Sequence, residues 1–206
     1  MLKADLLLDS ARPFSDDLNI MKGCPEHGSE GVPFSWYVLR VSYSRELKVK
    51  AAMDAMGVRC FVPMMWRKKS VDGKTERKLV PAVGNLCFVY WSRHGIDDFI
   101  RGYGENSPVH YYWDRTASRP MTVPEKAMDD FITVASSMDE DLIYLTEISD
   151  KLREGQTVKV KSGSFAGITG KIVRIRKSRR IMVELPGMLA VASTYVAPES
   201  IEIITA

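Results

Sequence analysis

The chain has 206 residues, of which 45% are hydrophobic and 27% are charged, and its formal net charge is +3. These values are typical of a globular protein with one large or two small domains. No apolar run approaches the roughly 20 residues that cross a bilayer. The composition therefore excludes a membrane-spanning helix, and we expect no membrane partner.

The first ten residues do not have the pattern of a secretory signal, because Asp5 and Asp9 interrupt their apolar stretch. We therefore expect a cytoplasmic protein. Residues 1–34 contain six acidic side chains and several prolines and glycines, which predicts a loosely ordered extension.

The cysteines are an odd number at wide spacing: Cys24, Cys60 and Cys87. Two of them lie in apolar, strand-like runs, where a free thiol behaves as a small hydrophobic group, so we expect no disulfide. Cys24 and His27 form at best half of a metal site. We expect neither a metal nor another cofactor.

The first domain is predicted to span residues 35–136 and to open with a strand over 36–41. A helix follows over about 44–56, where one apolar face is formed at helical spacing by Val49, Ala52, Met53 and Met56. Gly57 is placed to end this helix. A second strand over 58–62 ends before Pro63.

The rest of this domain alternates strands with short helices. Asp72-Gly73 indicates a hairpin, and residues 86–91 form an apolar strand. A short helix is predicted over 96–101, a strand over 109–113, and a last helix after Pro124. The buried face of that helix is predicted to comprise Ala127, Met128, Phe131, Ile132 and Ala135. The pattern predicts a sheet with helices attached.

Residues 137–151 are polar and acidic at their start and are predicted to be a linker to a second domain over 152–206. In that domain Val158 and Val160, and then Ile172 and Ile175, alternate with polar residues as in half-buried strands. Three glycines lie between or beside the strands: Gly163, Gly167 and Gly170. The segment resembles a KOW motif, a module of transcription and translation proteins. A phosphate-binding loop is disfavoured, because no Gly-Lys-Ser/Thr sequence and no helix pattern follow.

The second domain has nine basic and four acidic side chains, a net charge of +5. Most of the excess lies on one strand and the turn after it: Lys171, Arg174, Arg176, Lys177, Arg179 and Arg180. Two readings stay open here. The residues form a surface that faces nucleic-acid phosphates, or they protect an edge strand from aggregation.

The order of elements and several short motifs resemble the NusG family of transcription elongation factors over nearly all of the chain after residue 35. The motifs are Trp36-Tyr-Val-Leu39, Val58-Arg-Cys-Phe-Val-Pro-Met64, Gly84-Asn-Leu-Cys-Phe-Val89, Ser118-Arg-Pro-Met-Thr-Val-Pro124, Gly155-Gln-Thr-Val-Lys-Val160 and Gly163-Ser-Phe165. The resemblance implies an α+β fold: an NGN domain with a mainly antiparallel sheet flanked by helices, then an SH3-like KOW β-barrel.

Among branches of the family, Cys60-Phe-Val-Pro63 and Asn85 look most like the specialised RfaH/UpxY-type regulators of surface-polysaccharide operons. The resemblance implies a non-catalytic protein that binds elongating RNA polymerase and promotes processive transcription and antitermination. The residues it assigns to polymerase binding are Trp36, Val83, Gly84, Asn85, Leu86, Asp97 and Asp98. The family has aromatic residues where this chain has Val83 and Leu86.

Each of these residues also has a structural interpretation. Trp36, Val83 and Leu86 are of the type that fills a core between sheet and helix. Asp97 and Asp98 fall at the predicted start of a helix, where carboxylates are favoured by the helix dipole.

Two basic sets are candidates for nontemplate DNA or nascent RNA. One lies beside the first helix and comprises Arg40, Arg45 and Lys48. The other lies on the hairpin and comprises Arg67, Lys68, Lys69, Lys74, Arg77 and Lys78. The alternative for the hairpin set is a solvated run of charge.

The KOW domain of the family binds the termination factor Rho or a small-subunit ribosomal protein. The corresponding residues here are Phe165, Leu185, Met188, Lys171, Arg174 and Arg176. In RfaH this domain can refold into a helical hairpin held by a glutamate, and Val80 occupies that position here. We therefore expect a permanent barrel in a monomeric protein. A ribosome-associated or RNA-chaperone KOW protein, which binds RNA without polymerase, stays an alternative.

Overall fold

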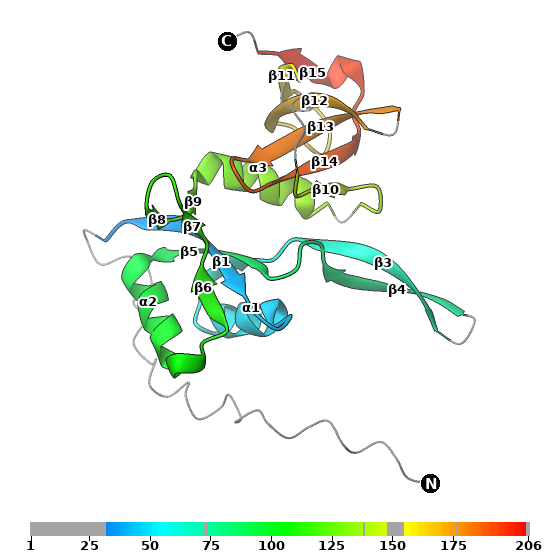
Figure 1. Cartoon of the computed structure of the whole chain (residues 1–206). Coiled ribbons are helices and arrows are strands. Elements are labelled where there is room, and N and C mark those ends of the chain that lie inside the picture. The colour runs from blue at the N-terminus through cyan, green and yellow to red at the C-terminus, as the bar shows by residue number, and fades with distance from the viewer. Residues whose placement is uncertain (1–31, 72–73, 138, 148–154, 176, 205–206) are drawn as a thin grey trace.

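The computed structural model describes residues 32–71, 74–137, 139–147, 155–175 and 177–204 (Figure 1). Nearly all of the predicted N-terminal extension, the Cys24/His27 pair, the hairpin turn at 72–73 and Arg176 lie outside the described residues. Within the described residues, no helix is both long and apolar enough to cross a membrane.

The first domain is built on an antiparallel sheet with the strand order β2-β5-β1-β6. Its strands are β1 (Phe34–Val41), β2 (Arg59–Phe61), β5 (Leu86–Ser92) and β6 (Val109–Tyr111), and β9 (Thr122–Val123) pairs with β1. In β5 all but one residue is buried. A strand is buried on both faces only if both faces of the sheet are covered, and helices cover them here.

One face of this sheet is covered by α1 (Glu46–Ala55) and α2 (Arg93–Gly102), and a short 3-10 helix, η2 (Gly104–Asn106), follows α2. The predicted apolar face of the first helix is confirmed for Val49, Ala52 and Met53, which are buried in α1, whereas Met56 is the half-buried C-cap residue after the helix.

Helix α2 begins three residues before the predicted start. The hydroxyl of Ser92 accepts a hydrogen bond from the Gly95 amide at 3.1 Å and caps the helix. Gly95 lies so close to the ring of Trp91 that a Cβ atom would overlap it. Because a glycine is a weak helix former, the sequence pattern did not reveal this first turn.

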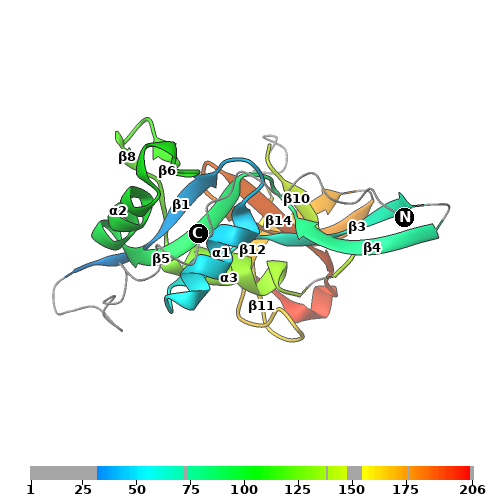
Figure 2. The same ribbon diagram turned by 90° about the horizontal axis from the view of Figure 1, so that it is seen from below.

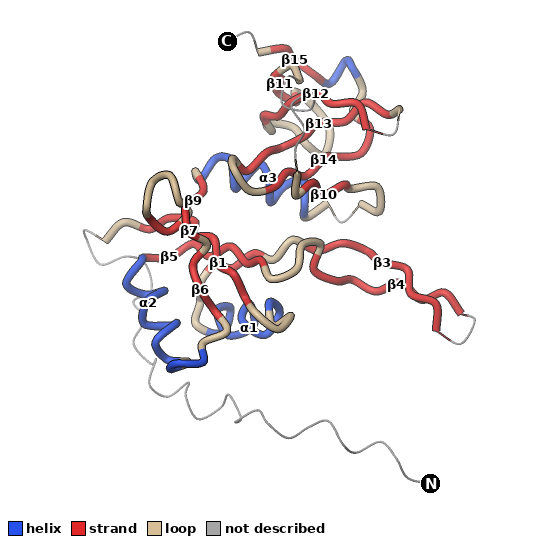
Figure 3. The backbone as a smooth tube through the Cα atoms, in the orientation of Figure 1, coloured by secondary structure: helices blue, strands red, loops and turns tan. Residues whose placement is uncertain are grey.

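The predicted hairpin is confirmed as β3 (Met64–Val71) and β4 (Lys74–Pro81), which pair in register from Met64↔Pro81 to Val71↔Lys74. It forms its own two-stranded sheet. Seen from below, it extends to one side of the domain, away from α2 (Figure 2). Its strands continue well beyond the body of the domain (Figure 3). A second small hairpin comprises β7 (Trp113–Asp114) and β8 (Arg119–Pro120).

The second domain is a curved, antiparallel six-stranded sheet with the order β10-β14-β13-β12-β11-β15. The strands are β10 (Ile143–Leu145), β11 (Thr157–Val160), β12 (Thr169–Ile175), β13 (Ser178–Leu185), β14 (Leu189–Tyr195) and β15 (Ile201–Ile203), and a 3-10 helix, η3 (Pro198–Ser200), precedes β15. The predicted strand, glycine-bearing turn and strand are thus β11 and β12. Strand β10, from the segment expected to be a linker, pairs with β14.

Helix α3 (Glu125–Ala135) lies between the two domains (Figure 1). Met128 and Phe131 are fully buried, and they belong to one apolar cluster that contains residues of both sheets, including Phe88 and Val183. The predicted face of this helix is correct but too narrow, because Asp130 and Val134 are also buried. The extra burial comes from the second domain, which packs against α3. The α+β fold class is confirmed.

Candidate interaction surfaces

The loop between β4 and β5 holds three of the residues assigned to polymerase binding. Gly84 and Asn85 are exposed, and Val83 is half-buried against the apolar cluster. Asn85 has a left-handed backbone (φ 61°), a conformation that asparagine tolerates better than most residues. The Asn85 carbonyl accepts a hydrogen bond from the Val41 amide at 3.1 Å, and the Ala82 amide donates to the Pro63 carbonyl at 2.8 Å.

Glu46, which the sequence analysis did not single out, anchors this loop to the start of α1. Its side chain is 2% exposed, and its carboxylate accepts a hydrogen bond from the Asn85 backbone amide. A buried carboxylate is costly unless it is hydrogen-bonded, so this contact fixes the loop to the start of α1. No local pattern in the chain indicates this contact, because the two residues are 39 positions apart.

Trp36 and Leu86, the other apolar residues assigned to polymerase binding, are each 2% exposed. Their structural interpretation is therefore correct in this arrangement: both side chains contribute to the core and not to a surface. Trp36 packs at 5.4 Å from the ring of Tyr90, and the guanidinium of Arg59 lies over both rings.

Val83 of this loop packs against an apolar cluster that includes a group of aromatic rings centred on Phe131. Its ring centroid is 6.2 Å from that of Phe61, 6.0 Å from Phe88 and 6.4 Å from Tyr144. The Tyr144 hydroxyl donates a hydrogen bond to the Met64 carbonyl at 3.1 Å, and burial raises the pKa of Tyr144 to about 12. This tyrosine connects β10 of the second sheet to the base of the hairpin.

Asp97 and Asp98 lie in the middle of α2 and not at its start, so the interpretation that the helix dipole favours them there is wrong. Asp97 accepts a hydrogen bond from the Tyr111 hydroxyl at 2.8 Å. Burial of that hydroxyl, together with this hydrogen bond, raises the pKa of Tyr111. Asp98 pairs with Arg101 at 2.6 Å. Both carboxylates are thus engaged with groups of their own domain, on the face of the sheet opposite to α3.

The basic set beside the first helix is divided between the two faces of the sheet. Arg40 is on the face of β1 that carries Trp36 and Val38, because side chains alternate along a strand. Arg45 and Lys48 are exposed at the start of α1, which packs on the other face. Arg45 lies over the ring of Tyr43, with 5.5 Å between the guanidinium carbon and the ring centroid.

The hairpin brings its basic set together on one projecting ribbon. Arg67, Lys68, Arg77 and Lys78 are exposed; the side chains of Lys69 and Lys74 lie outside the described part of the structure. Arg77 forms an ion pair with Glu140, which follows α3.

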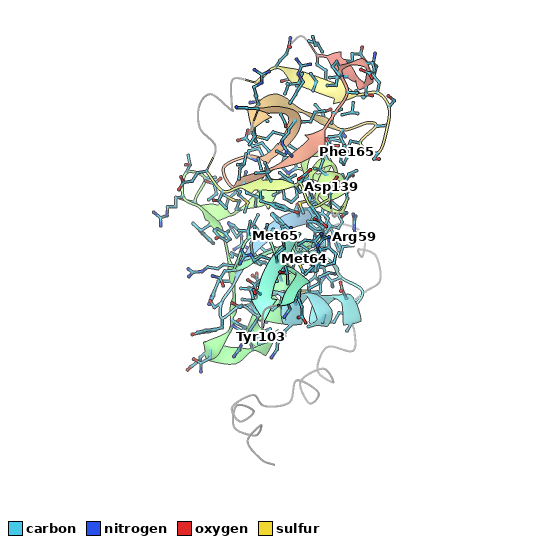
Figure 4. The ribbon with its side chains drawn as sticks, turned by 90° about the vertical axis from the view of Figure 1, so that its right-hand side faces the viewer. Arg59, Met64, Met65, Tyr103, Asp139 and Phe165 are labelled. Carbon is cyan, nitrogen blue, oxygen red and sulfur yellow. The ribbon has the colours of Figure 1, made fainter. Side chains whose placement is uncertain are left out.

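The residues expected to bind partners of the KOW domain lie in different environments. Leu185 is fully buried, so it is a core residue and that expectation is corrected. Phe165 and Met188 are half-buried against the shared apolar cluster. Arg174 is exposed and Lys171 half-buried. In Figure 4, Asp139 lies near the junction between the domains, and Phe165 lies on the side of this junction that carries the second domain.

Polar contacts also connect α3 to the second domain. Asp130 accepts a hydrogen bond from Lys126 at 2.6 Å and from the Thr169 amide at 3.4 Å. Lys126 donates a further hydrogen bond to the Gly167 carbonyl. The buried Arg180 donates to the backbone carbonyls of Asp141 and Ser193 and thereby attaches the connecting segment to β13.

Cys60 and Cys87 are free thiols whose sulfur atoms lie 3.1 Å apart. Their hydrogen bond and burial raise the pKa of Cys87. Among the described residues, no three His, Cys, Asp or Glu side chains are grouped as a metal site would require.

The structure thus consists of a sheet domain with a projecting basic hairpin, joined by a shared helix to a second, strand-rich domain. Residues 34–132 match the family model described as "Transcription termination factor nusG", and residues 154–184 match the KOW motif. The first domain of the chain is therefore similar to the NusG family, and the second domain contains a KOW motif.

One solved structure that is similar to the chain is described as "Domain interaction in Thermotoga maritima NusG". Its sequence identity is 18% and the TM-score is 0.44, and the match covers 84% of this chain and 98% of that chain. No curated protein matches the chain.

Proposed function

We propose that the chain binds elongating RNA polymerase through the loop between β4 and β5 and promotes processive transcription and antitermination. The observation that carries this proposal is the anchored, exposed loop at Val83, Gly84 and Asn85, at the position where the family resemblance places the polymerase contact. A loop that is already fixed loses little conformational entropy on binding.

The mechanism needs no catalytic group. A ligand that prefers the elongating state of polymerase over the paused state shifts the population between them, and about 1.4 kcal/mol of preference gives a tenfold shift. The proposal includes the specialised RfaH/UpxY-type branch and surface-polysaccharide operons, which rest on Cys60-Phe-Val-Pro63 and Asn85 alone.

Nucleic acid is the second proposed partner. The hairpin cations Arg67, Lys68, Arg77 and Lys78 are exposed on a ribbon that projects from the domain, as a phosphate-binding surface requires. Arg45 and Lys48 form a separate, smaller candidate at the start of α1. For the KOW domain, a protein partner such as Rho or a small-subunit ribosomal protein stays a proposal, with Arg174 and the half-buried Phe165 and Met188 as its candidate contacts.

Co-purification with core RNA polymerase tests the main proposal. Gly84→Glu is the informative variant, because a Cβ at Gly84 meets no atom within 4 Å and the variant is expected to fold. Leu86→Arg would instead place a charge in the core. Ala51→Glu adds the same side chain on the exposed side of α1, over the opposite face of the sheet, and is the matched control.

The expected result is that the natural chain and Ala51→Glu bind polymerase and lengthen transcripts in an elongation assay, whereas Gly84→Glu binds at least about tenfold more weakly. Equal binding of all three proteins would reject the loop as the contact. If the natural chain binds RNA but not polymerase, the RNA-chaperone alternative replaces the proposal.

A further inference from the structure

The β3–β4 hairpin contains two successive pairs of like charges directly across its strands. Arg67 is opposite Lys78, and Lys68 is opposite Arg77. Like charges at directly opposite positions destabilise a strand pair. Because successive residues face opposite sides of a ribbon, one pair lies on each face. These four cations do not stabilise the hairpin by themselves. A bound polyanion would offset the repulsion between them and so account for their presence.

One face of the hairpin adds a large aromatic side chain to its cations. Trp66 is two residues from Lys68 on the same strand, so it shares the face of Lys68 and of its partner Arg77. The Trp66 side chain is 42% exposed, although tryptophan is one of the most apolar residues. An indole beside two cations is the combination that binds single strands, since unpaired bases stack on the ring and phosphates pair with the cations. In a duplex the base faces are already stacked and give the ring no partner.

Arg77 on this face already has a carboxylate partner. It pairs with Glu140, which lies between α3 and β10 and is flanked by the exposed Asp139 and Asp141. A carboxylate and a phosphate oxygen bind guanidinium in the same way. A phosphate that binds Arg77 must therefore displace Glu140.

We propose that the hairpin face formed by Trp66, Lys68 and Arg77 binds single-stranded nucleic acid, and that Glu140 competes with it for Arg77. Trp66 stacks on an unpaired base, and Lys68 and Arg77 bind backbone phosphates. The inference rests on the proposed nucleic-acid role of the hairpin and adds the type of strand, the stacking residue and the competing acid.

The test is fluorescence anisotropy of the full-length chain with a short single-stranded DNA of mixed sequence, with RNA of the same sequence and with the corresponding duplex. Tighter binding of either single strand than of the duplex is expected, and the DNA and RNA arms identify which strand is preferred. Equal or tighter binding of the duplex would overturn the proposal.

The stacking role is tested by Trp66→Ala, with Trp66→Phe as the conservative variant. Trp113→Ala is the matched control, because Trp113 is 51% exposed but lies on β7. Trp66→Ala should weaken single-strand binding about tenfold and leave the dependence on salt unchanged, whereas Trp66→Phe should retain most of the affinity. Lys68→Gln should weaken the dependence on salt: the slope of log K for single-strand binding against log salt concentration should become less negative by about 0.7. No loss in Trp66→Ala, or an equal loss in Trp113→Ala, would refute stacking.

The competition is tested by Glu140→Gln against Glu147→Gln, a second exposed acid outside the hairpin contact. Glu140→Gln should bind the single strand about two- to fivefold more tightly at low salt, since exposed ion pairs contribute little, and the gain should vanish at high salt. Identical behaviour of the two variants would exclude the competition. Polymerase co-purification separates the two proposals. If Trp66→Ala still binds polymerase and its oligonucleotide affinity is unchanged, only this inference is rejected. If the natural chain binds neither polymerase nor nucleic acid, the proposed function is rejected.

Discussion

Phe131→Ala should destabilise both domains of the chain together. The Phe131 ring is fully buried and contacts Phe61 and Phe88 of the first domain and Tyr144 of β10 in the second sheet. Replacing a core phenylalanine by alanine typically costs 3–5 kcal/mol, and aromatic contacts add to the loss, so we expect the free energy of unfolding to fall by about 4 kcal/mol. The melting temperature should fall by about 10 °C.

Urea denaturation followed by two probes measures this effect. All four tryptophans precede α3, so tryptophan fluorescence reports the first domain, whereas far-ultraviolet circular dichroism reports both. The two transitions should coincide and move to lower urea together. Tyr112→Ala, at a position that is 38% exposed, should change the free energy of unfolding by less than about 1 kcal/mol. The shared cluster would be refuted if the fluorescence transition moved to lower urea while the dichroism signal showed a second transition at the original urea concentration.

Three further outcomes follow from single residues. Gly170→Ala should cost about 2 kcal/mol of stability in thermal denaturation, because its Cβ would lie 2.7 Å from the Met182 carbonyl oxygen; an unchanged melting temperature would contradict this packing. Tyr144 has a folded-state pKa of about 12, above the ordinary value of 10, so its contribution to stability should be fully present below about pH 10 and be lost between pH 10 and 12. Denaturation across this pH range should show a smaller fall in stability for Tyr144→Phe than for the natural chain. Iodoacetamide should label Cys60 in the native protein but Cys87 only after denaturation, since Cys87 is buried with a raised pKa; equal labelling rates would exclude this difference.

The sequence predicted those elements whose signal is local. Helix α1 followed from the spacing of Val49, Ala52 and Met53, and the hairpin from Asp72-Gly73. The glycines of the KOW motif were predicted as turn residues. Gly163 and Gly167 do have a left-handed backbone, but Gly170 lies in β12, where it permits close approach to β13.

The residues that the sequence did not reveal depend on long-range contacts. Asp130 is buried because the second domain covers α3, and Glu46 is buried because it holds Asn85. Neither residue stands out among its neighbours in the chain. The resemblance assigns Trp36 and Leu86 to polymerase binding, whereas both faces of the sheet are covered and both side chains lie in the core.

The position of α3 has a consequence for how this protein can be divided into fragments. The first matched segment ends at residue 132 and the second begins at residue 154, which suggests two separable expression units. A cut after residue 132 would remove Val134 and Ala135 from the helix and would expose apolar side chains on both resulting pieces. A first-domain fragment that is to stay in solution should therefore keep all of α3 and replace apolar residues on its outer side by polar ones. The sequence similarity marks where the motifs lie, while the helix between them determines what folds as a unit.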